Sequence, residues 1–377
     1  MKKLQMVDLK GQYDKIKQTV DASIQEVLDT TTYINGPEVH KFQKNLEEYL
    51  GVKHVIPCAN GTDALQIAMM GLGLEPGDEV ITADFTFAAT VEVIALLQLT
   101  PVLVDVEPDS FNISVEAIRN AITPKTKAIV PVHLFGQTAD MEAIMALAEE
   151  HDLYVIEDNA QAIGAEYTFA DGTKKKAGTI GHVASTSFFP SKNLGCYGDG
   201  GAIFTNDDEL AHKLRGIVNH GMYERYHHDV VGVNSRLDSV QAAVLNAKLP
   251  HLDDYNKARR AAAEKYSKAF AGHADIITPV IKGDDESHVF HQYTLRILNA
   301  DRNALMKHLL DKSIPCAIYY PIPLHSQKAY ASGRYNEDDF TVTNQLVKEV
   351  ISLPMHTELD DEQIAFITQT ILDFLSI

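Results

Sequence analysis

The chain has 377 residues, 45% of them hydrophobic, and a formal net charge of -19. Since domains contain roughly 100–200 residues, this length predicts two or three domains, and the apolar content is enough for a large core. The acidic balance argues against a nucleic-acid partner, because binding to phosphate backbones depends on clustered Lys and Arg. The sequence has no run of about 18 apolar residues and no signal-like N-terminus, so we expect a cytoplasmic protein without a membrane partner.

Between about residues 50 and 210, short β-branched runs alternate with helical stretches. The expected strands are 79–82, 101–106, 128–133, 154–157, 186–189 and 201–205. The expected helices of this region are 63–72, 88–97 and 141–150. Such alternation predicts an α/β fold with a mostly parallel sheet and helices on both sides. Ligands of these sheets bind at the carboxyl ends of the strands.

After residue 250 the pattern changes. We expect helices at 258–270, 302–311 and 361–375, with a strand-like stretch at 291–297. This pattern predicts a smaller α+β domain. The expected domains are therefore residues 1–250 and residues 251–377.

The segment Asn60-Gly61-Thr62-Asp63 stands at the start of the expected helix 63–72. Gly61 lets another group approach the backbone closely, and Thr62 or Asp63 can cap the helix. Free N–H groups at a helix N-terminus attract an anion such as a phosphate. A plain helix start without a ligand is the alternative interpretation.

Asp158 and Lys192 each follow an expected strand. A lysine held there can form a Schiff base with a carbonyl cofactor, and a nearby carboxylate can keep a pyridine nitrogen protonated. Pyridoxal phosphate (PLP) requires both groups. Asp158 could instead be an ordinary aspartate at the start of a helix, and Lys192 could be a surface lysine. The apolar neighbours Phe188, Phe189 and Leu194 argue against an exposed Lys192.

The glycine-rich segment 194–201 could be a nucleotide phosphate loop, but it lacks a Gly-Lys-Ser/Thr ending and precedes an expected strand. We interpret it as a tight turn. The segment 220–237 is rich in His, Tyr and Arg, which suggests an anion or sugar site, or metal ligands. His227 and His228 are adjacent and so point in different directions. The three cysteines show no Cys-x-x-Cys spacing, so we expect no metal site.

Together these motifs resemble the DegT/StrS family of sugar-nucleotide aminotransferases, a branch of the fold-type I PLP enzymes, over about residues 8–354. The resemblance implies a seven-stranded, mostly parallel sheet flanked by helices, with the smaller C-terminal α+β domain. It implies PLP covalently bound to Lys192, which also carries the proton of the reaction, and a ring nitrogen paired with Asp158. The other cofactor contacts implied are the phosphate ligands Gly61, Thr62, Asp63 and Ser187, the stacking ring of Phe87, and Gln161 at the 3-hydroxyl.

The resemblance also implies a homodimer with shared active sites, in which Asn234 reaches the neighbour's cofactor phosphate. Arg236 and Tyr320 would face the nucleotide sugar. Tyr319 stands where the family usually has His, which puts a histidine contact with the substrate in doubt.

The implied reaction moves an amino group from L-glutamate to a nucleotide-linked ketosugar, as in amino-sugar and surface-polysaccharide biosynthesis. The sequences of these motifs are most similar to those of family members that aminate a UDP-linked 3-oxo sugar of the glucuronate type. A dTDP-linked 3-oxo sugar, a 4-oxo-6-deoxy sugar and a non-catalytic regulator of the same fold stay open. A dehydratase of this fold would carry His in place of Lys192, so the lysine argues against that activity. An NAD enzyme would show Gly-x-Gly-x-x-Gly after an early strand, and this sequence has no such motif there.

Overall fold

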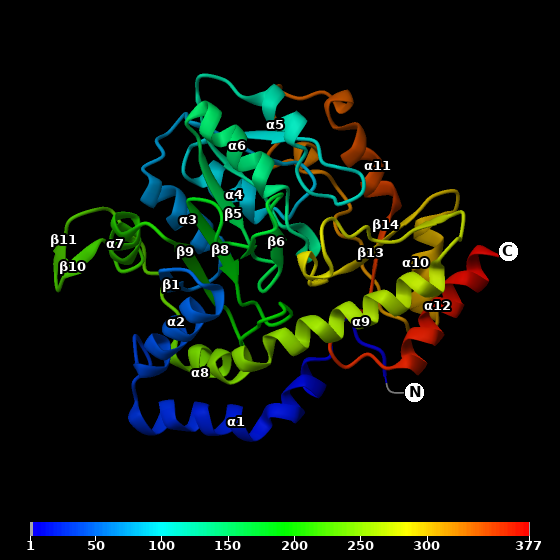
Figure 1. The fold of residues 1–377 in the computed structure, drawn as a ribbon, viewed down its shortest axis with the longest axis horizontal. Coiled ribbons are helices and arrows are strands. Elements are labelled where there is room, and N and C mark those ends of the chain that lie inside the picture. Colours follow the sequence, from blue (N-terminus) through cyan, green and yellow to red (C-terminus); the bar gives the residue numbers. More distant parts are fainter. Residues whose placement is uncertain (1–2, 377) are drawn as a thin grey trace.

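A seven-stranded sheet forms the centre of the computed structural model, which describes residues 3–376 (Figure 1). In spatial order the strands are β1 (His54–Cys58), β9 (Gly201–Thr205), β8 (Val183–Ser187), β5 (Tyr154–Asp158), β4 (Thr126–Val130), β2 (Glu79–Ala83) and β3 (Thr100–Val104). β9 pairs antiparallel with both of its neighbours, whereas the other pairs are parallel. The expected mostly parallel sheet is confirmed.

The central strands are largely buried because both faces of the sheet are covered. All five residues of β2 are buried, for example. One face packs against α3 (Gly61–Leu72), α4 (Ala89–Leu96) and α7 (Asp208–Ile217). The other face packs against α5 (Val115–Ala121), α6 (Met141–His151), α11 (Thr341–Glu349), α2 (Pro37–Leu50) and α8 (Ser239–Lys248). The result is a three-layer arrangement.

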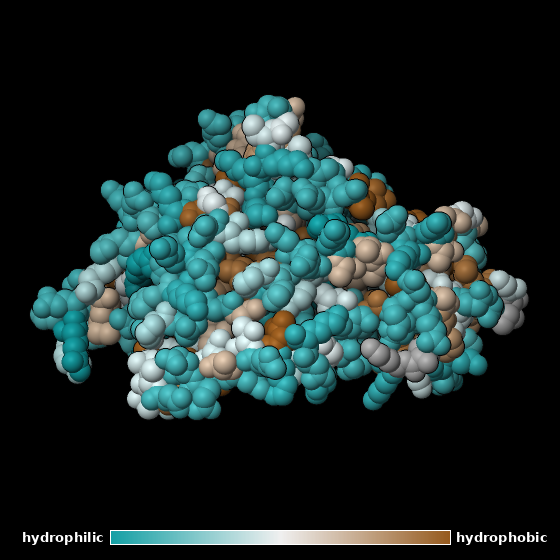
Figure 2. Space-filling model, turned by 60° about the horizontal axis from the view of Figure 1, so that its bottom comes forward, coloured by the Kyte–Doolittle hydropathy of each residue, from teal (hydrophilic) through white to brown (hydrophobic). Residues whose placement is uncertain are grey.

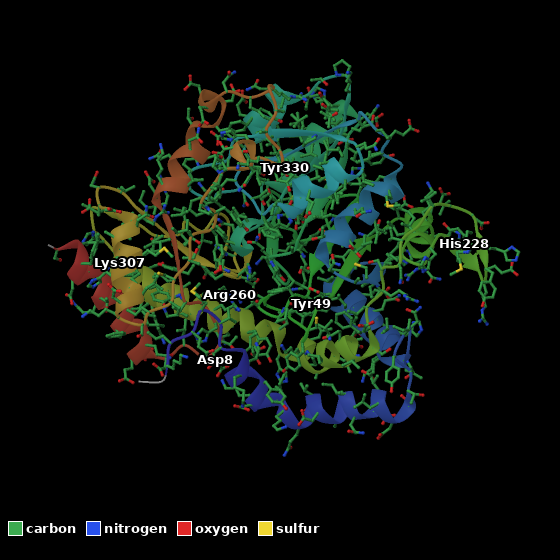
Figure 3. The ribbon with its side chains drawn as sticks, turned by 180° about the vertical axis from the view of Figure 1, so that it is seen from behind. Asp8, Tyr49, His228, Arg260, Lys307 and Tyr330 are labelled. Carbon is green, nitrogen blue, oxygen red and sulfur yellow. The ribbon has the colours of Figure 1, made fainter. Side chains whose placement is uncertain are left out.

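The long helix α1 (Leu9–Thr30) lies outside this arrangement and runs along α8 (Figure 1). Val20 of α1 packs against Val244 and Ala247 of α8, and all three side chains are buried. Figure 3, which labels Asp8 at the N-cap of α1, shows the same arrangement from behind. α8 is therefore held between α1 and the body of the sheet.

The C-terminal part is built on a small antiparallel sheet. Its strands are β12 (Ile276–Ile277), β13 (Tyr293–Ile297) and β14 (Val350–Leu353), and its helices are α9 (Leu252–Phe270), α10 (Arg302–Asp311) and α12 (Asp361–Leu375). Leu4 joins the core of this part, and the Met355 N–H donates to the Met6 carbonyl at 3.1 Å. The domain boundary at residue 250 stays a prediction.

Two hairpins extend from the sheet. The first pairs β6 (Glu166–Thr168) with β7 (Lys174–Lys176), and the second pairs β10 (Met222–Glu224) with β11 (His227–His228). The second hairpin projects from the body as an arm, with His228 labelled on it in Figure 3. Elsewhere the face shown in Figure 2 is mainly hydrophilic, with apolar residues in small scattered patches. No helix between residues 3 and 376 is both long and apolar enough to span a bilayer.

Candidate active site

Lys192 lies in the loop after β8, where its backbone N–H donates to the Phe189 carbonyl at 2.9 Å. Its side chain is half-buried. Burial lowers the pKa of Lys192 from 10.5 to about 8, and the nearby Asp158 carboxylate acts in the opposite direction. A lysine with this pKa has a sizeable neutral fraction near physiological pH, so it is a competent nucleophile.

The apolar surroundings expected for Lys192 are present only in part. Phe188 and Leu194 are fully buried, but Phe189 is 52% exposed. The expected strand at 186–189 also ends earlier, at Ser187. The next residue, Phe188, is buried in the core, where its ring centroid lies 5.3 Å from that of Phe42.

Asp158 ends β5, the parallel neighbour of β8, and is 5% exposed. Its two carboxylate oxygens have different partners. Thr90 Oγ1 donates to Oδ2 at 2.8 Å, and the Ala160 N–H donates to Oδ1 at 3.1 Å. These bonds fix the orientation of the carboxylate. Because strands β5 and β8 are adjacent and parallel, Asp158 and Lys192 meet at the same edge of the sheet.

The start of α3 lies directly against Ser187. A Cβ added at Gly61 would come within 2.7 Å of Ser187 Cβ, so the position has no room for a side chain. Asn60, and not Thr62 or Asp63 as expected, caps the helix, because Asn60 Oδ1 accepts the Asp63 N–H at 2.8 Å. The cap engages the Asp63 N–H and leaves the N–H groups of Gly61 and Thr62 without a side-chain cap. With Ser187 beside them, these N–H groups form a candidate anion site.

Phe87 lies just before α4 with 57% of its side chain exposed. Its ring centroid is 6.3 Å from that of Tyr320. The Tyr320 hydroxyl accepts a 3.3 Å hydrogen bond from Gln161 Nε2, while Gln161 Oε1 accepts from the Phe135 N–H at 2.7 Å. Three predicted site residues, Phe87, Gln161 and Tyr320, thus form one group. An exposed phenyl ring beside such polar groups suits a planar aromatic ligand.

Tyr319 and Tyr320 follow one another on the segment that leads out of the small sheet, and their rings are 6.0 Å apart. Burial raises the pKa of both phenols. Both groups therefore stay protonated at neutral pH and can donate a hydrogen bond to a ligand.

Asn234 and Arg236 lie in the segment that precedes α8. Asn234 is exposed, Arg236 is partly exposed, and between residues 3 and 376 the Arg236 guanidinium has no hydrogen-bond or ionic partner. Between them, buried Ser235 accepts the Ala59 N–H through its Oγ at 3.1 Å. This bond fixes the segment beside the start of α3. The predicted reach of Asn234 into a neighbouring subunit stays a prediction.

Sequence reasoning missed Asn60, Thr90 and Ser235. Asn60 has a readable signal, since Asn before a helical glycine is a favoured N-cap. Thr90 and Ser235 have no such signal, because their partners Asp158 and Ala59 are far away along the chain. Between residues 3 and 376 there is no group of three or more His, Cys, Asp or Glu side chains arranged to hold a metal ion.

Comparison with known proteins agrees with this geometry. A model of the DegT/DnrJ/EryC1/StrS aminotransferase family matches residues 14–372. The chain belongs to this family. The resemblance inferred from the sequence and the expected aminotransferase class are therefore confirmed.

Relatives in this family have different described roles. The chain is 46% identical to a "Pleiotropic regulatory protein" of Geobacillus stearothermophilus, over 98% of each chain. It is 47% identical to the UDP-2-acetamido-2-deoxy-3-oxo-D-glucuronate aminotransferase of Pseudomonas aeruginosa, over 97% of this chain and 98% of the relative. It is 40% identical to a dTDP-3-amino-3,4,6-trideoxy-alpha-D-glucose transaminase of Streptomyces venezuelae, over 95% and 92%.

Solved structures agree over nearly the whole length. DesV of S. venezuelae, in complex with a ketimine intermediate, superposes with a TM-score of 0.94 at 38% identity and 99% coverage of both chains. NtdA of Bacillus subtilis, with bound cofactor PMP, superposes with a TM-score of 0.88 at 30% identity, covering 96% of this chain and 82% of the other. PLP is the cofactor that this family membership implies.

The residues of this aminotransferase fit PLP. The anion site at Gly61 and Ser187 suits its phosphate, and the exposed ring of Phe87 suits its pyridine face. The buried carboxylate of Asp158 suits a protonated ring nitrogen, and the lowered pKa of Lys192 suits an aldehyde partner. These fits rest on four different features of the chain: a helix N-terminus, an exposed aromatic ring, a buried carboxylate and a lysine with a lowered pKa.

Proposed function

We propose that this chain transfers the amino group of L-glutamate to a nucleotide-linked ketosugar, with PLP bound covalently to Lys192. One observation carries the proposal: Lys192, with a pKa near 8, and the buried Asp158 lie at the ends of neighbouring parallel strands. A desolvated lysine suits the cofactor aldehyde, and a carboxylate oriented by Thr90 suits a protonated ring nitrogen. When bound, PLP supplies an electron-accepting ring that stabilises negative charge at the substrate Cα.

The protein side chains have distinct roles in this proposal. Lys192 binds the cofactor and, once released, moves the proton at the substrate Cα, for which an amine with a pKa near 8 is suited. Asp158 keeps the ring nitrogen protonated. Phe87 covers one ring face, and Gly61, Thr62 and Ser187 surround the phosphate. The Asp63 N–H, expected as a further ligand, is engaged by Asn60 Oδ1 instead. Gln161 would hold the ring's 3-hydroxyl through its Nε2 donor, which contacts the Tyr320 hydroxyl.

The substrate side is assigned to Arg236, Tyr319 and Tyr320. Among residues 3–376 no carboxylate pairs with Arg236, so its guanidinium is suited to the diphosphate or to a carboxylate of the sugar. The reaction balances as one amino group transferred: L-glutamate becomes 2-oxoglutarate and the ketosugar becomes an aminosugar. The 47% identical relative favours a UDP-linked 3-oxo sugar, and the 40% identical relative keeps a dTDP-linked sugar as the alternative.

We also propose that two copies of the chain share their active sites. The β10–β11 arm carries Tyr226 with 75% exposure, and Val231 just beyond it is 86% exposed. Apolar side chains on a projecting arm are typical of an interface with another chain. The arm leads directly into Asn234, which is proposed to reach the neighbour's cofactor phosphate. We place the enzyme in the cytoplasm, as expected from the sequence.

The test is the visible absorption of the purified protein with PLP, before and after addition of L-glutamate. Lys192→Ala is compared with Lys213→Ala, which changes an exposed lysine on α7. The proposal expects a band that only Lys192→Ala removes and that L-glutamate bleaches. UDP- and dTDP-linked 3-oxo and 4-oxo sugars are then tested for restoring the band.

A band that forms but does not bleach would favour the regulatory role named for the 46% identical relative. The absence of any Lys192-dependent band would overturn the proposal. Sedimentation of the wild-type protein, compared with Tyr226→Ser together with Val231→Ser, tests the dimer.

A further inference from the structure

A second buried lysine lies beneath the loop that carries Lys192. Lys248, the last residue of α8, is 1% exposed. Its Nζ donates a 2.7 Å hydrogen bond to the Gly195 carbonyl and lies 4.6 Å from the ring centroid of Tyr197. No carboxylate between residues 3 and 376 forms an ion pair with it. Burial lowers the pKa of Lys248 to about 8.

Burying an amine without a carboxylate is costly, because the charged form loses its hydration. The contacts that offset this cost both belong to the Lys192 loop: a backbone carbonyl and an aromatic face. Lys248 takes no part in the proposed chemistry, since it lies below the loop on the α8 side. Its contacts indicate a role in holding the Lys192 loop in place.

The loop itself is tightly folded. The Phe188 N–H donates to the Gly200 carbonyl and the Cys196 N–H donates to the Phe188 carbonyl, both at 2.8 Å. A Cβ added at Gly195 would come within 2.4 Å of the Pro190 carbonyl oxygen. Gly195 is therefore pressed against residues 189–190 on one side and held by Lys248 on the other.

Gln241 provides a second contact from the same helix. Its Oε1 accepts the Tyr197 N–H at 2.8 Å, and a Cβ at Gly198 would come within 2.8 Å of its Nε2. Gln241 and Lys248 are seven residues apart, which places them two turns apart on one face of α8. Val244 and Ala247 pack α8 against α1, so the helix that contacts the loop is itself held on its other side.

We propose that Lys248, together with Gln241, is a positioning residue that holds the Lys192 loop at the carboxyl edge of the sheet. The inference rests on the proposed function, because the position of Lys192 matters only if it binds PLP. It adds that α8 connects this loop to the Asn234–Arg236 segment, which lies just before the N-cap of the helix, Asp238. A displacement of the N-terminal end of α8, at Ser239, would then alter how readily the apoprotein binds PLP.

The experiment compares Lys248→Met with Lys213→Met, the same change at an exposed lysine. The apoproteins are titrated with PLP, and the Lys192-dependent absorption band is followed. Borohydride reduction and the mass of the intact chain then report the fraction of chains with PLP attached. Loss of one charge-assisted hydrogen bond should raise the PLP dissociation constant of Lys248→Met about tenfold. Lys213→Met should match the wild type.

Urea unfolding of the apoproteins separates positioning from stability alone. If Lys248→Met lowers the unfolding midpoint but binds PLP and forms the band as the wild type does, the inference is overturned. Gln241→Met decides the matter if Lys248→Met does not fold, because Gln241 is only partly buried. Weaker PLP capture by Gln241→Met supports the inference, and wild-type capture overturns it. A wild type without any Lys192-dependent band would instead remove the proposed function.

Discussion

Thr90 Oγ1 donates a 2.8 Å hydrogen bond to Asp158 Oδ2, and both side chains are buried. Thr90 lies in the first turn of α4, three residues after Phe87, whereas Asp158 ends β5. The bond therefore joins the segment that carries the exposed ring to the carboxylate proposed for the ring nitrogen. It fixes one carboxylate oxygen and leaves Oδ1 with a single backbone donor.

Thr90→Val is expected to weaken this arrangement while keeping the shape of the side chain. A hydrogen bond to a charged group contributes about 1.5–3 kcal/mol, so the rate of the L-glutamate half-reaction should fall at least tenfold and PLP should bind more weakly. Thr90→Ser, which keeps the hydroxyl, is the control and should stay within about threefold of the wild type. The measurements are PLP titration and the single-turnover rate at which L-glutamate bleaches the absorption band. Equal values for the Val and Ser variants would contradict the role given to Thr90.

The rate at which the apoprotein captures PLP should depend on pH through Lys192. The neutral amine is the attacking form, and burial lowers the pKa of Lys192 to about 8. The rate should therefore rise as pH increases toward 8 and level off above it. Stopped-flow absorbance at several pH values measures this dependence, with Lys192→Ala as the blank. A rate that keeps rising about tenfold per unit beyond pH 9 would indicate an unperturbed lysine instead.

Asp84 and His325 form a buried pair that connects the start of the Phe87 segment to the segment after Tyr320. Asp84 Oδ2 is 2.7 Å from His325 Nδ1, and Asp84 Oδ1 accepts the His325 N–H at 2.7 Å. Asp84→Ala leaves two buried donors without a partner, so the free energy of unfolding should fall by about 3 kcal/mol. Urea unfolding measures the change.

The matched control is Asp208→Ala. Asp208 Oδ1 lies 2.8 Å from His54 Nε2 in a pair of similar length, but Asp208 is 72% exposed. Exposed pairs contribute about 0–1 kcal/mol, so this variant should be nearly as stable as the wild type. Similar losses from both variants would mean that burial does not strengthen the Asp84–His325 pair.

Gly201 is required where β9 passes the start of α3 at Asn60 and Gly61. A Cβ at this position would come within 2.4 Å of the Asn60 carbonyl carbon and oxygen. Gly201→Ala should displace the start of α3, lower the midpoint of thermal unfolding and reduce PLP affinity by about tenfold or more. Gly333→Ala, where a Cβ meets nothing within 4 Å, is the control. Wild-type PLP affinity in Gly201→Ala would show that Asn60 can move without cost.

Much of the fold follows from local patterns. The expected helices 302–311 and 361–375 agree with α10 and α12, and the expected strand 201–205 agrees with β9. Helix α9 begins earlier than expected, at Leu252, because the turn at Leu249–His251 passes directly into it. The alternation of strands and helices indicated that Asp158 and Lys192 share one edge of the sheet, since parallel strands place their carboxyl ends together.

The sequence by itself therefore determined the fold class, the edge of the sheet that carries the site and the two groups that suit PLP. Only the tertiary structure decided which side chains orient them. Thr90 with Asp158, Asp84 with His325 and Lys248 with Gly195 are pairs whose members lie far apart in the chain. Hydrophobic periodicity reports which face of an element is buried. It does not report which partner a buried polar group finds there, because that depends on how distant elements pack.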